Sequence, residues 1–179
     1  MAYRRTSRNS KIFKDKIIHV PKNGLINLHS AILPDYRGIL GTLHAIKDKK
    51  NEIGCTLHTI PNSGIDTGEI IEIAKLAVNP QRSLLWNIIQ TYPLGAELLS
   101  KVLQKIQHHI PVETQKQNLQ QGNYFSVPTQ NDFEKIKHLG MEIISAKDYQ
   151  HILTNFVVKS LSKTEEGTLK TMIRKAIKY

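Results

Sequence analysis

Cysteine is nearly absent from this chain of 179 residues, and long apolar runs are absent altogether. The one cysteine, Cys55, excludes an intramolecular disulfide and a zinc site made of cysteines. No stretch approaches the roughly 18 apolar residues that a membrane-spanning helix needs, and the basic first residues lack the apolar segment of a secretory signal. We therefore expect a soluble, cytoplasmic protein in which Cys55 is a buried structural thiol.

Acidic residues are also scarce. Aspartate and glutamate number 15 against 25 lysines and arginines, so the formal net charge is +10. Such an excess favours an anionic partner, either nucleic acid or a small anionic molecule. Six of the first 16 residues are basic, without apolar periodicity. We expect residues 1–15 to form a basic arm, and nucleic acid is the less favoured partner because such arms are often only solvated.

The length fits one domain with a sizeable core and a small appendage. Apolar patterns predict strands at residues 24–29, 52–60 and 69–78. The turn at 61–68 should join the last two strands into an antiparallel pair. Residues 33–38 are expected as a loop, and residues 111–122, rich in glutamine and asparagine, as an exposed linker.

Helices are expected where apolar residues recur at intervals of three and four. They are predicted at 39–49, 83–108 and 148–161, and at the end of the chain behind a cap formed by Ser162 and Glu165. Pro93 should kink or break the helix at 83–108, because proline lacks the N–H that a helix interior needs.

The most informative residues are Asn27, His29 and Asp66. Side chains alternate across a strand, so Asn27 and His29 project from the same face. If the turn at 61–68 brings Asp66 to this strand end, the site combines hydrogen-bond donors for a developing oxyanion with a carboxylate that manages a proton, as acyl transfer requires. The alternative is structural: Asn27 closes a turn, and His29 is a partly buried histidine paired with a carbonyl.

The histidines also raise the question of a metal. His29, His58 and Asp66 have the ligand types of a facial metal site, but their spacing does not require one, and we expect no metal. Five of the other histidines are expected at the surface; they are His44, His108, His109, His138 and His151.

Four motifs occur in order within a short part of the chain. They are a strand ending Asn-x-His at 27–29, Leu-Pro-x-Tyr-Arg-Gly at 33–38, Gly-x-Thr-x-His at 54–58, and Gly-Ile-Asp-Thr-Gly-x-Ile-Ile at 64–71. Over residues 17–106 the chain thereby resembles the folate-dependent formyltransferases, which include the glycinamide ribonucleotide, methionyl-tRNA and amino-sugar N-formyltransferases. The resemblance implies an α/β fold, the C-terminal portion of a Rossmann-like formyltransferase sheet with flanking helices. A catalytic region is expected at 16–110, a linker at 111–122 and a small, mainly helical extension at 123–179.

The resemblance also implies a reaction and its residues. The reaction is transfer of a formyl group from 10-formyltetrahydrofolate to the amine of a small molecule. Asn27 and His29 would donate hydrogen bonds to the formyl oxygen, and Asp66 would orient His29 and help to remove a proton from the amine. His58 would support this catalytic region. The folate pterin would face the backbone of Asn62, Ser63, Gly64 and Ile65.

The chain departs from the family before the first strand. Only 26 residues precede Asn27, whereas family members carry a much longer segment there that forms the first strands of the sheet. Its loss would expose a sheet edge and an apolar surface. Three alternatives follow: a fragment of a longer enzyme, a chain completed by self-association or by a partner that supplies the missing half, or a non-catalytic remnant that serves as an interaction module.

The acceptor is open as well. The positive charge favours a methionyl-tRNA formyltransferase-like enzyme, whose tRNA substrate would bind in a salt-dependent way. Residues 123–129 instead resemble a tail segment of less characterised formyltransferase-like proteins, which counts against tRNA.

Overall fold

The computed structural model describes residues 14–157, 167 and 171. The elements in chain order are α1 (Asp15–Ile18), β1 (Ile26–His29), β2 (Tyr36–Gly38), α2 (Gly41–Lys47), β3 (Glu52–Thr59), β4 (Ile70–Ala77), α3 (Leu84–Gln107), β5 (Asn123–Phe125), α4 (Gln130–His138), α5 (Ala146–Ile152) and a π-helical turn (Leu153–Val157). Most of the predicted basic arm and the last helix with its cap at Ser162 and Glu165 lie outside the described residues. Within the described part, no helix is both long and apolar enough to cross a bilayer.

Three strands form an open antiparallel sheet in the order β1-β3-β4. The central strand β3 is buried at every position from Ile53 to His58, because it lies between two strands and beneath α3. The predicted pairing of 52–60 with 69–78 is confirmed. Cys55 is buried as expected, and burial raises the pKa of its thiol.

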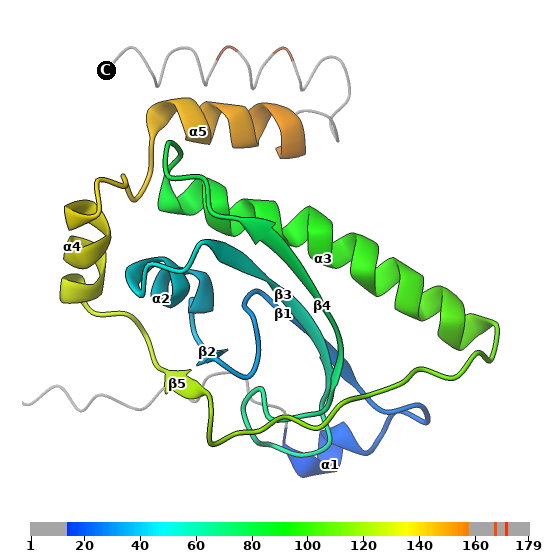
Figure 1. Ribbon diagram of the computed structural model, residues 1–179. Coiled ribbons are helices and arrows are strands. Elements are labelled where there is room, and N and C mark those ends of the chain that lie inside the picture. Colours follow the sequence, from blue (N-terminus) through cyan, green and yellow to red (C-terminus); the bar gives the residue numbers. More distant parts are fainter. Residues whose placement is uncertain (1–13, 158–166, 168–170, 172–179) are drawn as a thin grey trace, which may run out of the picture.

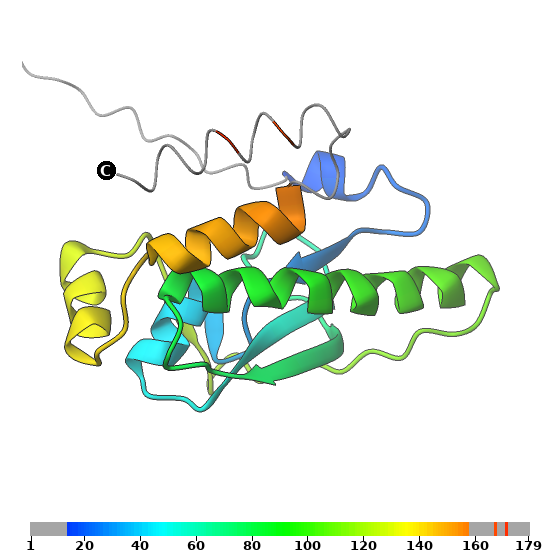
Figure 2. The same ribbon diagram turned by 90° about the horizontal axis from the view of Figure 1, so that it is seen from above.

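The long helix α3 covers one face of this sheet, and α5 packs against α3 (Figure 1, Figure 2). The inner face of α3 carries Leu98 and Val102, which pack with Cys55 and Leu57. Gly95 permits the approach to β1, because a Cβ there would lie 2.6 Å from Leu28 Cδ2.

Pro93 does not break α3, so the break, one of the two effects that we expected of it, does not occur. The helix runs from Leu84 to Gln107, and the Ser83 side chain caps its start by accepting a hydrogen bond from the Trp86 N–H. Pro93 lies on the exposed side, and buried residues before and after it pack on the protein interior. Packing of both halves thus offsets the one backbone hydrogen bond that proline removes.

Strand β2 occupies part of the segment that we expected to be a loop, residues 33–38. Strand β5, which follows the expected linker, pairs with it. Residues 36–38 form β2, which pairs in parallel with β5. Helix α4 follows, capped by the Asp132 carboxylate, which accepts a hydrogen bond from the Thr129 N–H at 2.8 Å. Ile136 and Met141 pack in the same core as Leu43 and Ile53. The division of the chain at 110/111 and 122/123 stays a prediction.

Candidate active site

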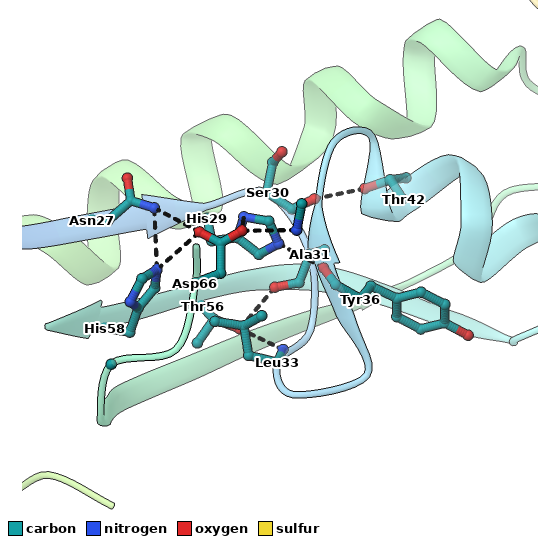
Figure 3. A network of polar contacts seen from close by, with 12 residues as sticks. Asn27, His29, Ser30, Ala31, Leu33, Tyr36, Thr42, Thr56, His58 and Asp66 are labelled. Carbon is teal, nitrogen blue, oxygen red and sulfur yellow. Dashed lines mark hydrogen bonds and ion pairs between the residues drawn. The ribbon is translucent and has the colours of Figure 1, made fainter. Parts of the chain in front are cut away.

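Strand pairing brings the candidate residues together. Asn27 on β1 lies opposite His58 on β3, and opposed residues of an antiparallel pair share one face of the sheet. His29 follows on the same face, and Asp66 reaches it from the turn between β3 and β4. Figure 3 shows all four side chains converging. The structure therefore brings Asn27, His29 and Asp66 together as the sequence led us to expect, and His58, which the resemblance placed in support of this region, lies next to Asn27 and Asp66.

Asp66 is the centre of this cluster. Its backbone is left-handed, with φ 52°, which turns the side chain inward. Oδ2 accepts a hydrogen bond from the Gly38 N–H at 2.8 Å and lies 3.6 Å from His29 Nδ1. Oδ1 lies 3.5 Å from Asn27 Nδ2 and 3.5 Å from His58 Nε2. The two carboxylate oxygens are thus surrounded by four nitrogen atoms, one from the main chain and three from side chains.

These neighbours decide the charge of Asp66. Burial alone would raise the pKa of its carboxyl, but the contact with His58, the proximity of His29 and the Gly38 N–H outweigh burial and hold the pKa below its ordinary value. Asp66 is therefore ionised at neutral pH and is able to accept a proton or to stabilise a neighbouring cation.

His29 is held by the backbone. Its Nε2 lies 2.7 Å from the carbonyl oxygen of Tyr36, and because a carbonyl only accepts, Nε2 carries the proton. The other ring nitrogen, Nδ1, faces Asp66 Oδ2 at 3.6 Å, so a proton on Nδ1 places a cation beside the carboxylate. Both the structural pairing with a carbonyl and the position beside Asp66 are realised in one residue. The catalytic role of His29 stays a prediction.

His58 fixes the amide of Asn27. Its Nδ1 lies 2.8 Å from the Thr59 carbonyl oxygen, and its Nε2 lies 3.1 Å from Asn27 Nδ2 and 3.5 Å from Asp66 Oδ1. The Asn27 nitrogen therefore points to His58 and Asp66, and its oxygen points away (Figure 3). To reach a substrate oxygen, an Asn27 N–H must either keep its present contact and form a second hydrogen bond, or rotate away from His58 and Asp66.

The expected pterin loop lies beside Asp66. Asn62, Ser63 and Gly64 are exposed, and Ile65 is half-buried. Two of its N–H groups are already engaged: Ser63 donates to Asp15 Oδ1 at 3.1 Å, and Gly64 donates to Asn62 Oδ1 at 2.8 Å. Recognition of a ligand by this backbone would rely on its carbonyl oxygens and on the N–H groups of Asn62 and Ile65.

The segment after His29 is fastened from both sides. Thr56 Oγ1 donates to the Ala31 carbonyl oxygen at 2.7 Å and accepts from the Leu33 N–H at 3.0 Å. Thr42 Oγ1 donates to the Ser30 carbonyl oxygen at 2.9 Å. These bonds hold the chain that leads to Tyr36 and Gly38, whose backbone groups bind His29 and Asp66 (Figure 3).

His44 is not a surface residue, contrary to our expectation. It is buried in α2 and stacks on Phe125 with ring centroids 4.0 Å apart. Burial and then the charge of Lys47 lower the pKa of His44. Its place on the inner face of the helix, beside Leu43, was the signal in the sequence.

The metal alternative has no counterpart in the described residues, where no three histidine, cysteine, aspartate or glutamate side chains are arranged to hold a metal ion. The nitrogen atoms of His29 and His58 that do not face Asp66 are bound to backbone carbonyls.

Acid should weaken the fold through Asp66. Its folded-state pKa is lowered, so the ionised carboxylate contributes stability that is present above the unfolded-state pKa of about 3.9 and is lost as the pH falls through the folded-state pKa. We expect urea unfolding to show wild type more stable than Asp66→Asn at neutral pH, with the difference shrinking below about pH 4. A difference that does not change with pH would contradict this assignment.

Residues 8–88 match the formyl transferase family. The chain is 32% identical over 103 residues to a methionyl-tRNA formyltransferase from Caldicellulosiruptor saccharolyticus, covering 58% of this chain and 33% of that protein. It is 37% identical over 91 residues to one from Synechococcus, covering 51% and 28%. The chain thus spans about a third of the length of these curated relatives.

Solved structures agree. The N-formyltransferase from Helicobacter canadensis, in complex with folinic acid and dTDP-3-aminofucose, superposes with a TM-score of 0.54 at 30% identity, over 70% of this chain and 49% of that one. A 4-N formyltransferase from Francisella tularensis gives 0.56 at 27%, over 69% and 48%.

The residues that match the family, 8–88, include the four motifs and the cluster around Asp66. The solved structures confirm the α/β, Rossmann-like formyltransferase portion that the motifs implied. Residues 8–88 belong to the formyl transferase family, and the chain is similar to methionyl-tRNA and sugar N-formyltransferases.

Proposed function

We propose that this protein transfers a formyl group from 10-formyltetrahydrofolate to the amine of a small molecule in the cytoplasm. The observation that carries the proposal is the convergence of Asn27, His29 and an ionised Asp66 on one face of the sheet. An amide donor, an imidazole and a carboxylate are the groups that acyl transfer to an amine requires. Bound 10-formyltetrahydrofolate would supply the activated formyl group; its N10–C bond would break as the amine–C bond forms, and N10 would take up the proton released by the ammonium, giving tetrahydrofolate.

The side chains of the site have different roles in this reaction. An ammonium must lose a proton before its nitrogen becomes a nucleophile, and Asp66 accepts that proton directly or through His29 Nδ1, 3.6 Å away. An Asn27 N–H, which is shared between His58 and Asp66 in this structure, turns toward the oxygen that gains negative charge. His58 keeps the amide nitrogen, not the oxygen, on this side.

The same cluster fits a formyl-folate donor. The exposed loop of Asn62, Ser63, Gly64 and Ile65 adjoins Asp66 and would hold the pterin by its backbone. The Helicobacter canadensis enzyme was solved with folinic acid, which supports a folate ligand for its relatives. We assign no metal to the reaction.

The acceptor we favour is an anionic amino compound. The relative from Helicobacter canadensis was solved with a nucleotide-linked amino sugar, and the net charge of +10 suits such a ligand. Methionyl-tRNA is the second candidate, because the curated relatives bear that name and the same charge attracts RNA.

A single-turnover assay tests the proposal. Enzyme in excess over the acceptor, which is one of a panel of nucleotide-linked amino sugars or methionyl-tRNA, is mixed with 10-formyltetrahydrofolate, and formylated product is measured by mass spectrometry. Product with an amino sugar supports the proposal, product with tRNA alone favours the second acceptor, and no product from folded protein leaves the non-catalytic module.

We also propose that self-association covers an exposed face. Tyr92, Leu103 and Ile106 project from α3 with 53%, 49% and 36% of their surface exposed, although aliphatic and aromatic residues on a long helix are normally covered. They recur at intervals typical of a helix–helix seam, and Ser100 and Gln107 beside them carry no charge. The same association would bring a second chain close to β1, at the edge of the sheet.

Leu103→Glu should therefore lower the association state of the protein. We expect sedimentation velocity to show a dimer or larger species for wild type and a monomer for Leu103→Glu, because a buried charge without a partner opposes association. Gln104→Glu, one residue away and exposed, is the matched control and should behave as wild type. A wild-type monomer would favour a separate polypeptide as the partner that covers this face.

A further inference from the structure

The segment 114–125, here called the strap, crosses the candidate site after leaving α3. Figure 1 shows it running from the end of α3 past the turn that carries Asp66 to β5. Gln115 forms an isolated antiparallel bridge with Ile70, with bonds of 2.8 and 2.7 Å. Arg37 Nη2 donates to the Gly122 carbonyl oxygen at 3.3 Å. The strap is thus fixed at both ends of the candidate site.

Gln117 lies in the middle of the strap, and its side chain forms hydrogen bonds with the backbone of the turn that carries Asp66. Its Nε2 donates to the backbone carbonyl oxygen of Asp66 at 3.0 Å and also to that of Gly68. One side-chain amide therefore binds two carbonyls of the turn in which Asp66 adopts its left-handed backbone. A residue with positive φ persists only where its surroundings hold it, and Gln117 supplies such contacts.

The other side of Asp66 is also tied to the strap. The Gly38 N–H that binds Asp66 Oδ2 belongs to β2, and β2 pairs with β5, where Gly38 lies opposite Phe125. The strap therefore holds the Asp66 backbone through Gln117 and the Asp66 carboxylate through β2.

The Gln117 amide contacts the turn through its donor side only. Gln117 Oε1 is buried without a hydrogen-bond partner among the described residues. A buried acceptor left unpaired opposes the gain from the two donated bonds. What the Gln117 amide does provide is a fixed position for the turn.

We propose that Gln117 is a positioning residue that keeps the Asp66 carboxylate between His29 and His58. Its effect on turnover rests on the proposed function, whereas its effect on the place of Asp66 does not. Loss of both donated bonds releases the turn, and small displacements of a catalytic group cost large factors in rate.

The test compares Gln117→Met, which removes both donors at similar length, Gln117→Glu, which replaces the donors by an acceptor, and Gln120→Met, an exposed control in the same strap. In single-turnover assays we expect both Gln117 variants to lower the rate at saturating 10-formyltetrahydrofolate by about 10- to 100-fold, with less than about threefold change in the half-saturating concentration. Gln120→Met should match wild type.

A second readout does not need turnover. Carbon-13 NMR of the Asp66 carboxyl should show a depressed pKa in wild type and Gln120→Met, and a pKa closer to the ordinary value in Gln117→Met, because the contacts that lower it are loosened. If wild type is inactive but this shift occurs, the proposed function fails and the positioning role stands. An unchanged Asp66 titration in folded Gln117→Met, or loss of folding in both Gln117 variants, would overturn the proposal.

Discussion

Asp66→Asn lowers the rate of formyl transfer by about 10²- to 10⁴-fold, the range for loss of a proton-transfer group. Asparagine has the same shape, and its carbonyl oxygen is still able to accept the Gly38 N–H. It accepts no proton at neutral pH, however, and it removes the negative charge beside His29 Nδ1. We therefore expect a defect in turnover at saturating donor, measured by single-turnover kinetics, with donor binding changed little.

The matched control is Asp35→Asn, which makes the same substitution at an exposed position just before Tyr36. It should retain the wild-type rate. Full activity of Asp66→Asn would remove Asp66 from the chemistry and leave it as a residue that only orders the turn.

Gly38→Ala destabilises the protein by more than about 1–3 kcal/mol, the usual cost of a strained backbone position. The φ of Gly38 is 97°, a conformation that side chains rarely adopt, and an alanine Cβ would collide with the backbone carbonyl of Phe125 on β5. The change would push β5 from β2 and shift the N–H that binds Asp66. The thermal unfolding temperature and the turnover rate should both be lower than in wild type.

Gly24→Ala separates the two causes. Gly24 also has positive φ, 73°, but nothing lies within 4 Å of the site of its Cβ. It should show the backbone cost without the collision and without loss of turnover. Equal destabilisation by the two substitutions would mean that the contact with β5 contributes nothing.

The sequence predicted the central sheet and the long helix because these segments are long enough for periodicity to show. Strands β1, β3 and β4 and helix α3 each follow an apolar pattern. The two strands β2 and β5 contain three residues each and pair across more than 80 residues of chain, so neither carries a periodic signal. Helix α4 had a local signal, the Thr129 and Asp132 cap, in a stretch of otherwise polar residues.

The sequence predicted which side chains meet in the candidate site, but not the groups that orient them. Asn27, His29 and Asp66 converge as expected, since strand alternation and a turn suffice to place them. The groups that set their orientation are main-chain atoms: the carbonyls of Tyr36 and Thr59 and the N–H of Gly38. Main-chain groups leave no mark in the sequence.

The tetrahydrofolate site itself is the central claim, and calorimetric titration with 5-formyltetrahydrofolate, a stable relative of the 10-formyl donor, tests it most directly. The full chain should bind with a micromolar dissociation constant. Asn27→Ala and His29→Ala should weaken binding clearly, and Asp35→Asn should leave it unchanged. No binding by the folded wild-type protein would contradict the enzyme assignment and leave a formyltransferase fold without its donor site.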